Sequence, residues 1–264
     1  MDIYNDFANI YDSLIDAPYK DWANYIEQLW QRHGAEPNSP PQEGCPKGGV
    51  VLDLACGTGS LTHILAAKGY DMIGIDASAE MLSVARQKGD ANGQILFLHQ
   101  DMREFELYGT VDAIVCVCDS INYLTDPADL VRVFALVHNY LNPGGLFIFD
   151  INSEYKYTNI LADNTFAHTS DTAAYIWENF YDAYGKINEY DMTFFVKDET
   201  SAHYRRFEET HVQRAYSVQE IKSALKSADL EYLAHYGELT FEAPKSDNAR
   251  IFFVSLKSKN PENQ

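Results

Sequence analysis

The sequence predicts an α/β fold in which helices cover both faces of a parallel sheet, with an antiparallel sheet inserted in the second half of the chain. Short apolar segments alternate with helical patterns between residues 50 and 151, which is typical of a parallel sheet. A stretch rich in Tyr, Phe, Trp, Val and Thr follows, as expected of antiparallel strands. The chain has 264 residues, of which 46% are hydrophobic, so it can bury the core of one large domain that carries an insertion.

The first elements in the chain are two predicted helices, because aromatic and apolar residues recur at helical spacing over residues 4–14 and 22–30. Pro18 separates them, and the prolines within residues 34–49 predict an exposed connector. The alternation that follows predicts strands at residues 50–55, 72–76, 95–99, 111–118 and 146–151, and helices at residues 60–68, 79–88 and 128–141.

The second half of the chain begins with three predicted antiparallel strands within residues 175–216. Ser217 and Glu220 have the spacing of a capping box, which predicts the start of a helix that ends near residue 228. Two closing strands are predicted at residues 231–237 and 250–257. We therefore expect a core made of residues 1–154 and 217–264, and an inserted antiparallel sheet made of residues 155–216.

Composition limits the classes of function. Lys and Arg total 20 against 39 Asp and Glu, a formal charge of −19, and this counts against a nucleic-acid partner. No apolar run reaches the roughly 18 residues of a spanning helix, and four Asp against one Lys in the first twenty residues are unlike a signal peptide. The four cysteines form no CxxC pair, and the eight histidines form no HExxH motif. We expect a cytoplasmic protein, a monomer or a homodimer, with reduced thiols and no metal site or membrane contact.

The strongest chemical signal is the run Val51-Leu-Asp-Leu-Ala-Cys-Gly-Thr-Gly-Ser60. A strand that ends in Gly57-Thr-Gly59 and leads into a helix brings the backbone close to a bound ligand and directs helix N–H groups towards it. A dinucleotide fingerprint has Gly or Ala at the third glycine position, where this chain has Thr62. This difference lowers the odds of a nicotinamide cofactor.

Acidic residues follow the next strands. Asp76, 17 residues after Gly59, can accept hydrogen bonds from both hydroxyls of a ribose, while Ser78 suits the cap of the following helix better. Met81 can cover a face of adenine, although a Met on a helix is more often part of the core. Asp101 can accept from the amino group of adenine and leave the Met102 N–H for a ring nitrogen. Two further landmarks are Asp119-Ser-Ile-Asn-Tyr-Leu124 and Leu141-Asn-Pro-Gly-Gly145.

These landmarks in this order resemble the class I S-adenosylmethionine-dependent methyltransferases, over about residues 4–151 and the closing strands. Other segments narrow the resemblance to a bacterial subgroup of small-molecule methyltransferases, akin to the N,N-dimethyltransferases of nucleotide-linked amino sugars. These segments are Tyr4-Asn-Asp-Phe-Ala-Asn-Ile-Tyr-Asp12, the pair Tyr19 and Trp22, Asp119-Ser120, Tyr175-Ile-Trp-Glu178 and Arg206-Phe-Glu-Glu-Thr-His-Val-Gln-Arg214.

The resemblance implies a Rossmann-like sheet of seven strands whose last strand is antiparallel, with S-adenosylmethionine as cofactor. The cofactor residues that it implies are Tyr11, Trp22, Asp53, Ala55, Gly57, Gly59, Asp76, Ala77, Met81, Asp101, Met102 and Asp119. The N-terminal helices would form a lid over the cofactor, and the inserted sheet would form a lid that selects the acceptor. Aromatics including Tyr175, Trp177, Phe180 and Tyr181 suit its pocket wall, or pack the insertion on the core.

The acceptor is expected to be a small molecule that offers an amine or a hydroxyl. Tyr11 and Tyr123 are the expected catalytic residues, and we expect them to position the reactants more than to act as a general base. The amino-sugar branch has a His at the position of Tyr123, so the acceptor need not be the same. His211 and Gln213 share one strand face with Glu209; this face either turns to the site or is a solvent-facing polar strip.

Three other functions use similar motifs. An RNA or protein methyltransferase would have the same core, a nicotinamide oxidoreductase would share the first two motifs, and a non-catalytic sensor would bind the cofactor without turnover.

Overall fold

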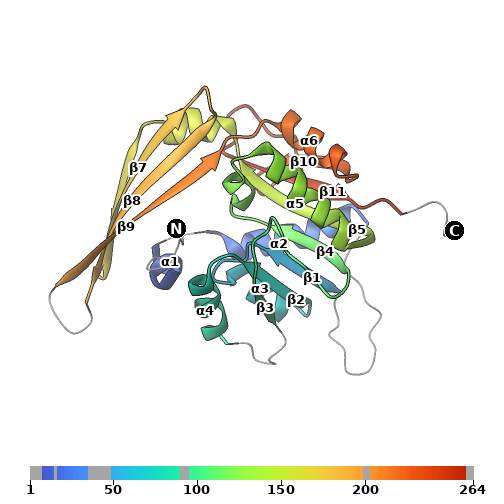
Figure 1. The fold of residues 1–264 in the computed structure, drawn as a ribbon, viewed down its shortest axis with the longest axis horizontal. Coiled ribbons are helices and arrows are strands. Elements are labelled where there is room, and N and C mark those ends of the chain that lie inside the picture. The colour runs from blue at the N-terminus through green and yellow to red at the C-terminus, as the bar shows by residue number, and fades with distance from the viewer. Residues whose placement is uncertain (1–7, 15–16, 35–48, 90–94, 199–202, 260–264) are drawn as a thin grey trace.

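The computed structural model describes residues 8–14, 17–34, 49–89, 95–198 and 203–259, and its core is a seven-stranded sheet (Figure 1). The strands are β1 (Val50–Leu54), β2 (Asp71–Asp76), β3 (Leu96–His99), β4 (Val111–Cys116), β5 (Leu141–Asn152), β10 (Glu231–Gly237) and β11 (Arg250–Leu256), in the order β10-β11-β5-β4-β1-β2-β3. Strands β1 to β5 pair in parallel, and β11 runs antiparallel to β5 and β10. The predicted sheet with an antiparallel last strand is confirmed.

Helices cover both faces of this sheet. On one face α5 (Pro127–Tyr140) and α6 (Val218–Ser227) bury a cluster that includes Leu52 and Leu54. On the other, α2 (Tyr19–Arg32) and α3 (Ser60–Ala67) pack on Val51, because successive side chains of a strand point to opposite faces. Helix α4 (Ala79–Gln87) packs on β2 and β3. The predicted capping box of Ser217 and Glu220 begins α6.

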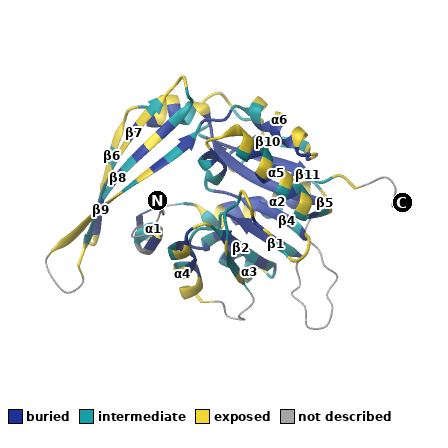
Figure 2. Cartoon of the chain, viewed as in Figure 1, coloured by how far each residue is buried: buried dark blue, intermediate teal, exposed yellow. Residues whose placement is uncertain are grey.

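The inserted segment forms a second sheet of four antiparallel strands, one more than predicted (Figure 1). They are β6 (Thr165–Thr169), β7 (Ala173–Asp182), β8 (Ile187–Lys197) and β9 (Tyr204–Arg214), reached from β5 through the short helix η2 (Lys156–Leu161). The prediction missed β6 because this edge strand is short and mostly exposed, so it carries little apolar alternation. Figure 2 shows buried and exposed residues alternating along β8 and β9, so this sheet has one covered face.

Helix α1 (Ala8–Leu14) lies between the inserted sheet and the core (Figure 1). Ile10, Tyr11 and Leu14 pack against the covered face of the inserted sheet. On the core side, Asp12 accepts a hydrogen bond of 2.7 Å from Thr58 Oγ1 and forms an ion pair of 2.7 Å with Lys88. The short helix therefore connects the two sheets.

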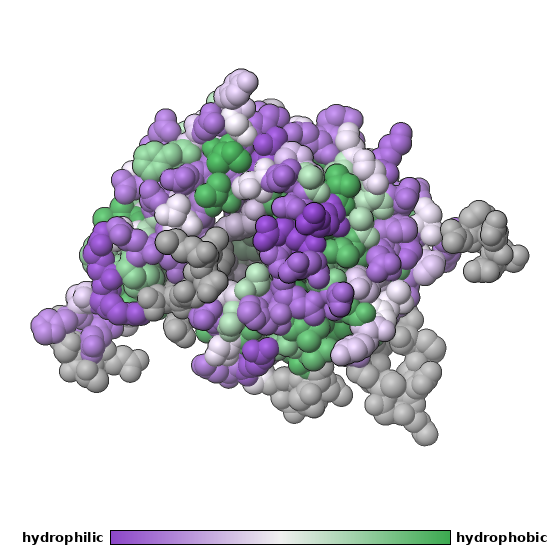
Figure 3. Space-filling model, viewed as in Figure 1, coloured by the Kyte–Doolittle hydropathy of each residue, from purple (hydrophilic) through white to green (hydrophobic). Residues whose placement is uncertain are grey.

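Some predicted features lie outside the described residues, namely residues 4–7 of the first helix, Cys45 and most of the connector. Within the described ranges, no helix is long and apolar enough to cross a membrane. Figure 3 shows that hydrophilic residues cover most of the face in view, in keeping with the high net charge.

Candidate active site

A cavity of about 1090 Å³ lies at the carboxyl edge of the core sheet, where β1, β2 and β4 end. The inserted sheet supplies its opposite wall through Trp177, Tyr190, Met192, Thr210 and His211, among others. Open α/β sheets bind ligands at this edge, where neighbouring strands connect in opposite directions. Small-ligand pockets usually measure about 300–1,000 Å³, so this cavity is at the upper end of the usual size.

The glycine turn after β1 borders the cavity. Gly57 has φ +55°, and a Cβ atom added there would meet no heavy atom within 4 Å, so its backbone is open to a ligand. Gly59 has φ +70°, and an added Cβ would lie 3.0 Å from the Ala85 Cβ and 3.1 Å from the Phe97 ring. Gly59 does not line the cavity. Close packing beneath the turn, together with the positive φ, therefore disfavours any side chain at position 59.

Asp53 lies under the turn and is buried. Thr62 Oγ1 donates a hydrogen bond of 2.6 Å to Asp53 Oδ2, which gives the residue at the third glycine position a structural role. Burial, opposed by the bond from Thr62, raises the pKa of Asp53 to about 7.

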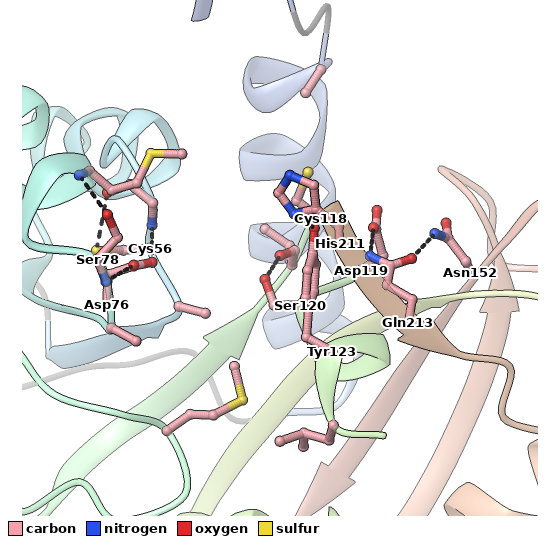
Figure 4. A pocket seen from close by; sticks show the side chains of 18 of the residues that line it. Cys56, Asp76, Ser78, Cys118, Asp119, Ser120, Tyr123, Asn152, His211 and Gln213 are labelled. Atoms are coloured by element: carbon pink, nitrogen blue, oxygen red, sulfur yellow. Dashed lines mark hydrogen bonds between the residues drawn. The ribbon is translucent and has the colours of Figure 1, made fainter. Parts of the chain in front are cut away.

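Asp76 ends β2 and holds the turn in place. Its two oxygens accept hydrogen bonds of 2.8 Å from the Gly57 N–H and the Ser78 N–H (Figure 4). Ser78 Oγ in turn accepts from the Met81 N–H and caps α4, as its position predicted. Burial raises the pKa of Asp76. Each carboxylate oxygen can accept a second hydrogen bond from the cavity.

Asp101 is more strongly paired within the protein. The Arg103 guanidinium donates to both of its oxygens, and this bonding lowers the pKa of Asp101. Asp101, Met102 and Met81 all line the cavity beside Asp76.

Asp119 is the centre of a buried charge network. It follows β4 at the second of two left-handed residues, since Cys118 has φ +63° and Asp119 has φ +53°. One of its oxygens accepts from Arg250 Nη2 at 2.7 Å. The other accepts from Gln213 Nε2 at 2.8 Å (Figure 4). Arg250 also pairs with Asp150 near the carboxyl end of β5. Burial acts against ionisation, but Arg250 and the nearby Lys156 outweigh it and lower the pKa of Asp119.

Gln213 ties this network to the inserted sheet. Its Oε1 accepts hydrogen bonds from the Tyr157 hydroxyl at 2.7 Å, from the Tyr190 hydroxyl and from Asn152 Nδ2 at 3.3 Å. The strand face of β9 that carries Gln213 and His211 therefore turns to the cavity, and the solvent-facing alternative for these two residues is wrong.

Three aromatic side chains, those of Trp22, Tyr11 and Tyr123, also line the cavity. Trp22 donates from Nε1 to Glu238 Oε1 at 3.1 Å, and the Arg250 guanidinium lies 5.0 Å from its ring centroid. The Tyr11 hydroxyl lies 3.7 Å from Cys118 Sγ. The Tyr123 hydroxyl lies 3.2 Å from His211 Nδ1, and Figure 4 shows these two side chains together.

The predicted site residues thus come together from distant parts of the chain. The twelve that line the cavity are Tyr11, Trp22, Asp53, Ala55, Gly57, Asp76, Ala77, Met81, Asp101, Met102, Asp119 and Tyr123. Of the aromatics expected in the pocket wall, Trp177 lines the cavity. Tyr175 and Tyr181 instead pack against the apolar cluster under the inserted sheet, and Phe180 is 52% exposed on the outer face of β7. Among the described residues, no group of three or more His, Cys, Asp or Glu is arranged to hold a metal ion.

Comparison with known proteins identifies the family. Residues 51–145 match the methyltransferase domain family. YqeM of Bacillus subtilis strain 168, a protein named as a methyltransferase, is 39% identical over 259 residues, which cover 97% of this chain and 98% of YqeM. The crystal structure of an S-adenosylmethionine-dependent methyltransferase from Clostridium acetobutylicum ATCC 824 is 34% identical, with a TM-score of 0.84 and coverage of 97% of this chain and 99% of that one.

The chain belongs to the S-adenosylmethionine-dependent methyltransferases. It is also similar to the Streptomyces fradiae dTDP-3-amino-3,6-dideoxy-alpha-D-glucopyranose N,N-dimethyltransferase, at 29% identity over 150 residues, which cover 56% of this chain and 53% of that protein. The predicted relation of this methyltransferase to the amino-sugar dimethyltransferases is confirmed.

The residues present fit the cofactor of this methyltransferase. The open backbone at Gly57 and the partly buried acid Asp76 form a cradle for a nucleoside, and the aromatic side chains of Tyr11 and Trp22 lie at the other end of the cavity. The predicted cofactor, S-adenosylmethionine, therefore suits the shape and the hydrogen-bonding groups of the site.

Sequence reasoning missed Arg250, Lys156 and Asp150. Asp150 carried a usable signal, because an acid inside an apolar strand needs a buried partner. Its partner Arg250 lies 100 positions further along the chain, so no local pattern joins the two.

Proposed function

We propose that this methyltransferase transfers the methyl group to an amine or hydroxyl of a small molecule. The observation that carries the proposal is the cavity of about 1090 Å³ that is lined by residues of both the core and the inserted sheet. Its acceptor wall includes the apolar side chains of Trp177 and Met192, which suit a small apolar body, and His211 on the same face of the inserted sheet offers a polar contact. The net charge of −19 disfavours an RNA acceptor.

The cofactor end follows from the hydrogen-bonding groups. Asp76 would bind the two ribose hydroxyls, Asp101 and the Met102 N–H would bind adenine, and Met81 would cover the base. Ala55, Gly57 and Ala77 would bring the backbone close, while Asp53 supports the turn from below. Asp119, Tyr11 and Trp22 would hold the methionine part. When bound, S-adenosylmethionine supplies an electrophilic methyl group on a positively charged sulfur.

The first contribution of the protein is to align the reactants and to exclude water. Tyr11 approaches from α1 and Tyr123 from the loop after β4, so two phenols from separate parts of the chain reach the cavity and can orient the acceptor. We assign residues 155–216 as the acceptor lid and α1 as the cofactor lid, because both border the cavity. Such positioning can lower a barrier by roughly 7–11 kcal/mol.

The proposal also places the reaction in the cytoplasm. Cys56, Cys116 and Cys118 form no disulfide among the described residues, as suits the reducing cytoplasm. We place the reaction there, on a soluble metabolite.

The proposal is tested by offering the purified protein labelled S-adenosylmethionine together with a small-molecule extract of bacterial cells, total tRNA or total protein. We expect label in the small-molecule fraction and a loss of that label with the Asp76→Ala variant. Label found only in tRNA or only in protein would show that the acceptor is RNA or protein and not a small molecule. Cofactor binding without transfer to any fraction would indicate a sensor.

A further inference from the structure

We infer that Tyr123, His211 and Glu209 form a proton relay that takes the proton released by the acceptor during methyl transfer. The inference deepens the function proposed above and rests on it. The three side chains come from two parts of the chain, the loop after β4 and strand β9 of the inserted sheet.

The relay consists of one hydrogen-bond contact, between Tyr123 and His211, and one contact at ion-pair distance, between His211 and Glu209. The Tyr123 hydroxyl lies 3.2 Å from His211 Nδ1, and His211 Nε2 lies 3.4 Å from Glu209 Oε2. Tyr123 and His211 line the cavity, and the side chains of His211 and Glu209 are only 2% and 9% exposed. Burying an imidazole and a carboxylate costs free energy unless the two groups are paired or hydrogen-bonded.

The position of the Glu209 carboxylate on the Nε2 side of His211 favours one tautomer, and this tautomer sets the direction of proton flow in the relay. An ionised Glu209 can only accept a hydrogen, so the hydrogen of a neutral His211 belongs on Nε2. His211 Nδ1 then carries a lone pair, and the Tyr123 hydroxyl donates to it. The phenol oxygen of Tyr123 is left with its own lone pairs for a hydrogen of the acceptor.

A neutral acceptor amine attacks the methyl group of S-adenosylmethionine. A nitrogen–carbon bond forms while the carbon–sulfur bond breaks, with its electron pair going to sulfur. The methylated ammonium gives one proton to the Tyr123 oxygen, and the Tyr123 hydrogen passes to His211 Nδ1. The resulting imidazolium is stabilised by the Glu209 carboxylate until its proton passes to solvent. A hydroxyl acceptor loses its proton by the same route.

A purely structural role predicts different behaviour. The Tyr123 and His211 rings pack edge to face at 6.0 Å between centroids, and packing alone would explain their contact. In that case an isosteric change that keeps the fold would leave turnover almost unaffected. A relay instead requires a proton acceptor at the position of His211 Nδ1.

The first arm of the test reads the hydrogen positions without any acceptor. Protein labelled with ¹⁵N-histidine is examined by long-range ¹H–¹⁵N NMR, and His211→Asn assigns the signal of His211. We expect the tautomer with hydrogen on Nε2, and a change in that signal in Glu209→Gln. A neutral His211 with its hydrogen on Nδ1 overturns the relay.

The second arm measures S-adenosylhomocysteine formation with the small-molecule extract at saturating S-adenosylmethionine. His211→Asn keeps an acceptor oxygen near the Nδ1 position but cannot take up a proton. General acid–base groups contribute about 10²–10⁴-fold to rate, so we expect a loss of about 100-fold. The melting temperature and the cofactor Kd should stay at the wild-type values.

Two comparisons separate a relay from independent positioning. The double variant Tyr123→Phe/His211→Asn should be no slower than the slower single variant, because residues that act as one unit are not additive. Added imidazole should restore part of the rate to His211→Ala. His168→Asn, the same change at an exposed position of β6, should keep full activity.

Multiplicative losses in the double variant, or wild-type turnover in His211→Asn, overturn the inference. If the wild-type protein transfers nothing to the extract, the proposed function fails, and the tautomer of His211 alone decides the relay geometry.

Discussion

Replacing Asp76 by Ala is the sharpest test of the cofactor site. Asp76 and Asp101 both line the cavity, but they differ in their hydrogen-bond partners within the protein. Asp76 is partly buried and its carboxylate accepts hydrogen bonds from the Gly57 and Ser78 N–H groups, whereas both oxygens of Asp101 already accept from the charged Arg103 guanidinium. We therefore expect Asp76→Ala to weaken cofactor binding more than Asp101→Ala does.

The expected magnitudes follow from the number of hydrogen bonds. Asp76 would accept from two ribose hydroxyls, and a hydrogen bond to a charged group is worth about 1.5–3 kcal/mol. Two such bonds give about 3–6 kcal/mol, which corresponds to about two to four powers of ten in Kd. Asp101 would accept from one amino group, so its loss should cost about one to two powers of ten.

Titration calorimetry with S-adenosylhomocysteine measures both values. Asp76→Ala also removes the acceptor of the Gly57 and Ser78 N–H groups, so its melting temperature is measured alongside. Asp76→Asn keeps one acceptor oxygen and serves as the matched control, with an affinity between wild type and Asp76→Ala. Equal affinities for the wild type and Asp76→Ala would refute the ribose assignment.

Four further predictions follow from the site. Burial raises the pKa of Asp53 to about 7, so the folded protein keeps a proton that the unfolded chain loses near pH 4. The stability that this group contributes is complete below about pH 4 and is lost as pH rises to about 7. Asp53→Asn should therefore flatten the fall in melting temperature between about pH 4 and about pH 7. If the melting temperature of Asp53→Asn falls with pH as that of the wild type does, the raised pKa of Asp53 is contradicted. Tyr11→Phe should lower turnover with an unchanged melting temperature, and wild-type turnover would show that its ring only packs. Trp177→Ala should raise the KM of the acceptor and leave the cofactor Kd unchanged, whereas a loss of cofactor affinity would argue against the acceptor lid. NAD should bind far more weakly than S-adenosylmethionine in calorimetry, because Thr62 Oγ1 bonds Asp53 where a dinucleotide site has its third glycine; the opposite ranking would contradict the cofactor end.

Local signals in the sequence were enough to predict the core. The strands of the parallel sheet are short apolar runs, and the turn at Gly57 needs a backbone that few other residues adopt. Asp76 could be placed at the tip of β2 because the carboxyl ends of parallel strands share one edge. The exposed edge strand β6 carries no comparable pattern, so the sequence did not predict it.

Tertiary position decided the rest of the site. Strand alternation placed His211 and Gln213 on one face, but the direction of that face depends on how the inserted sheet rests on the core. The same dependence made Phe180 a wrong choice for the pocket wall, since the even positions of β7 turn outwards. The pairing of Arg250 with Asp119 joins residues 131 positions apart, which no local pattern connects.

The shared carboxylate of Asp119 makes the two halves of the cavity thermodynamically linked. One oxygen is bound by Arg250 of the core and the other by Gln213, whose amide oxygen is held by tyrosines of the inserted segment. A ligand that strengthens or weakens the Gln213 contact from one side changes the affinity for the ligand on the other side. Such coupling is reciprocal, so the factor by which an acceptor changes the cofactor Kd equals the factor by which the cofactor changes the acceptor Kd.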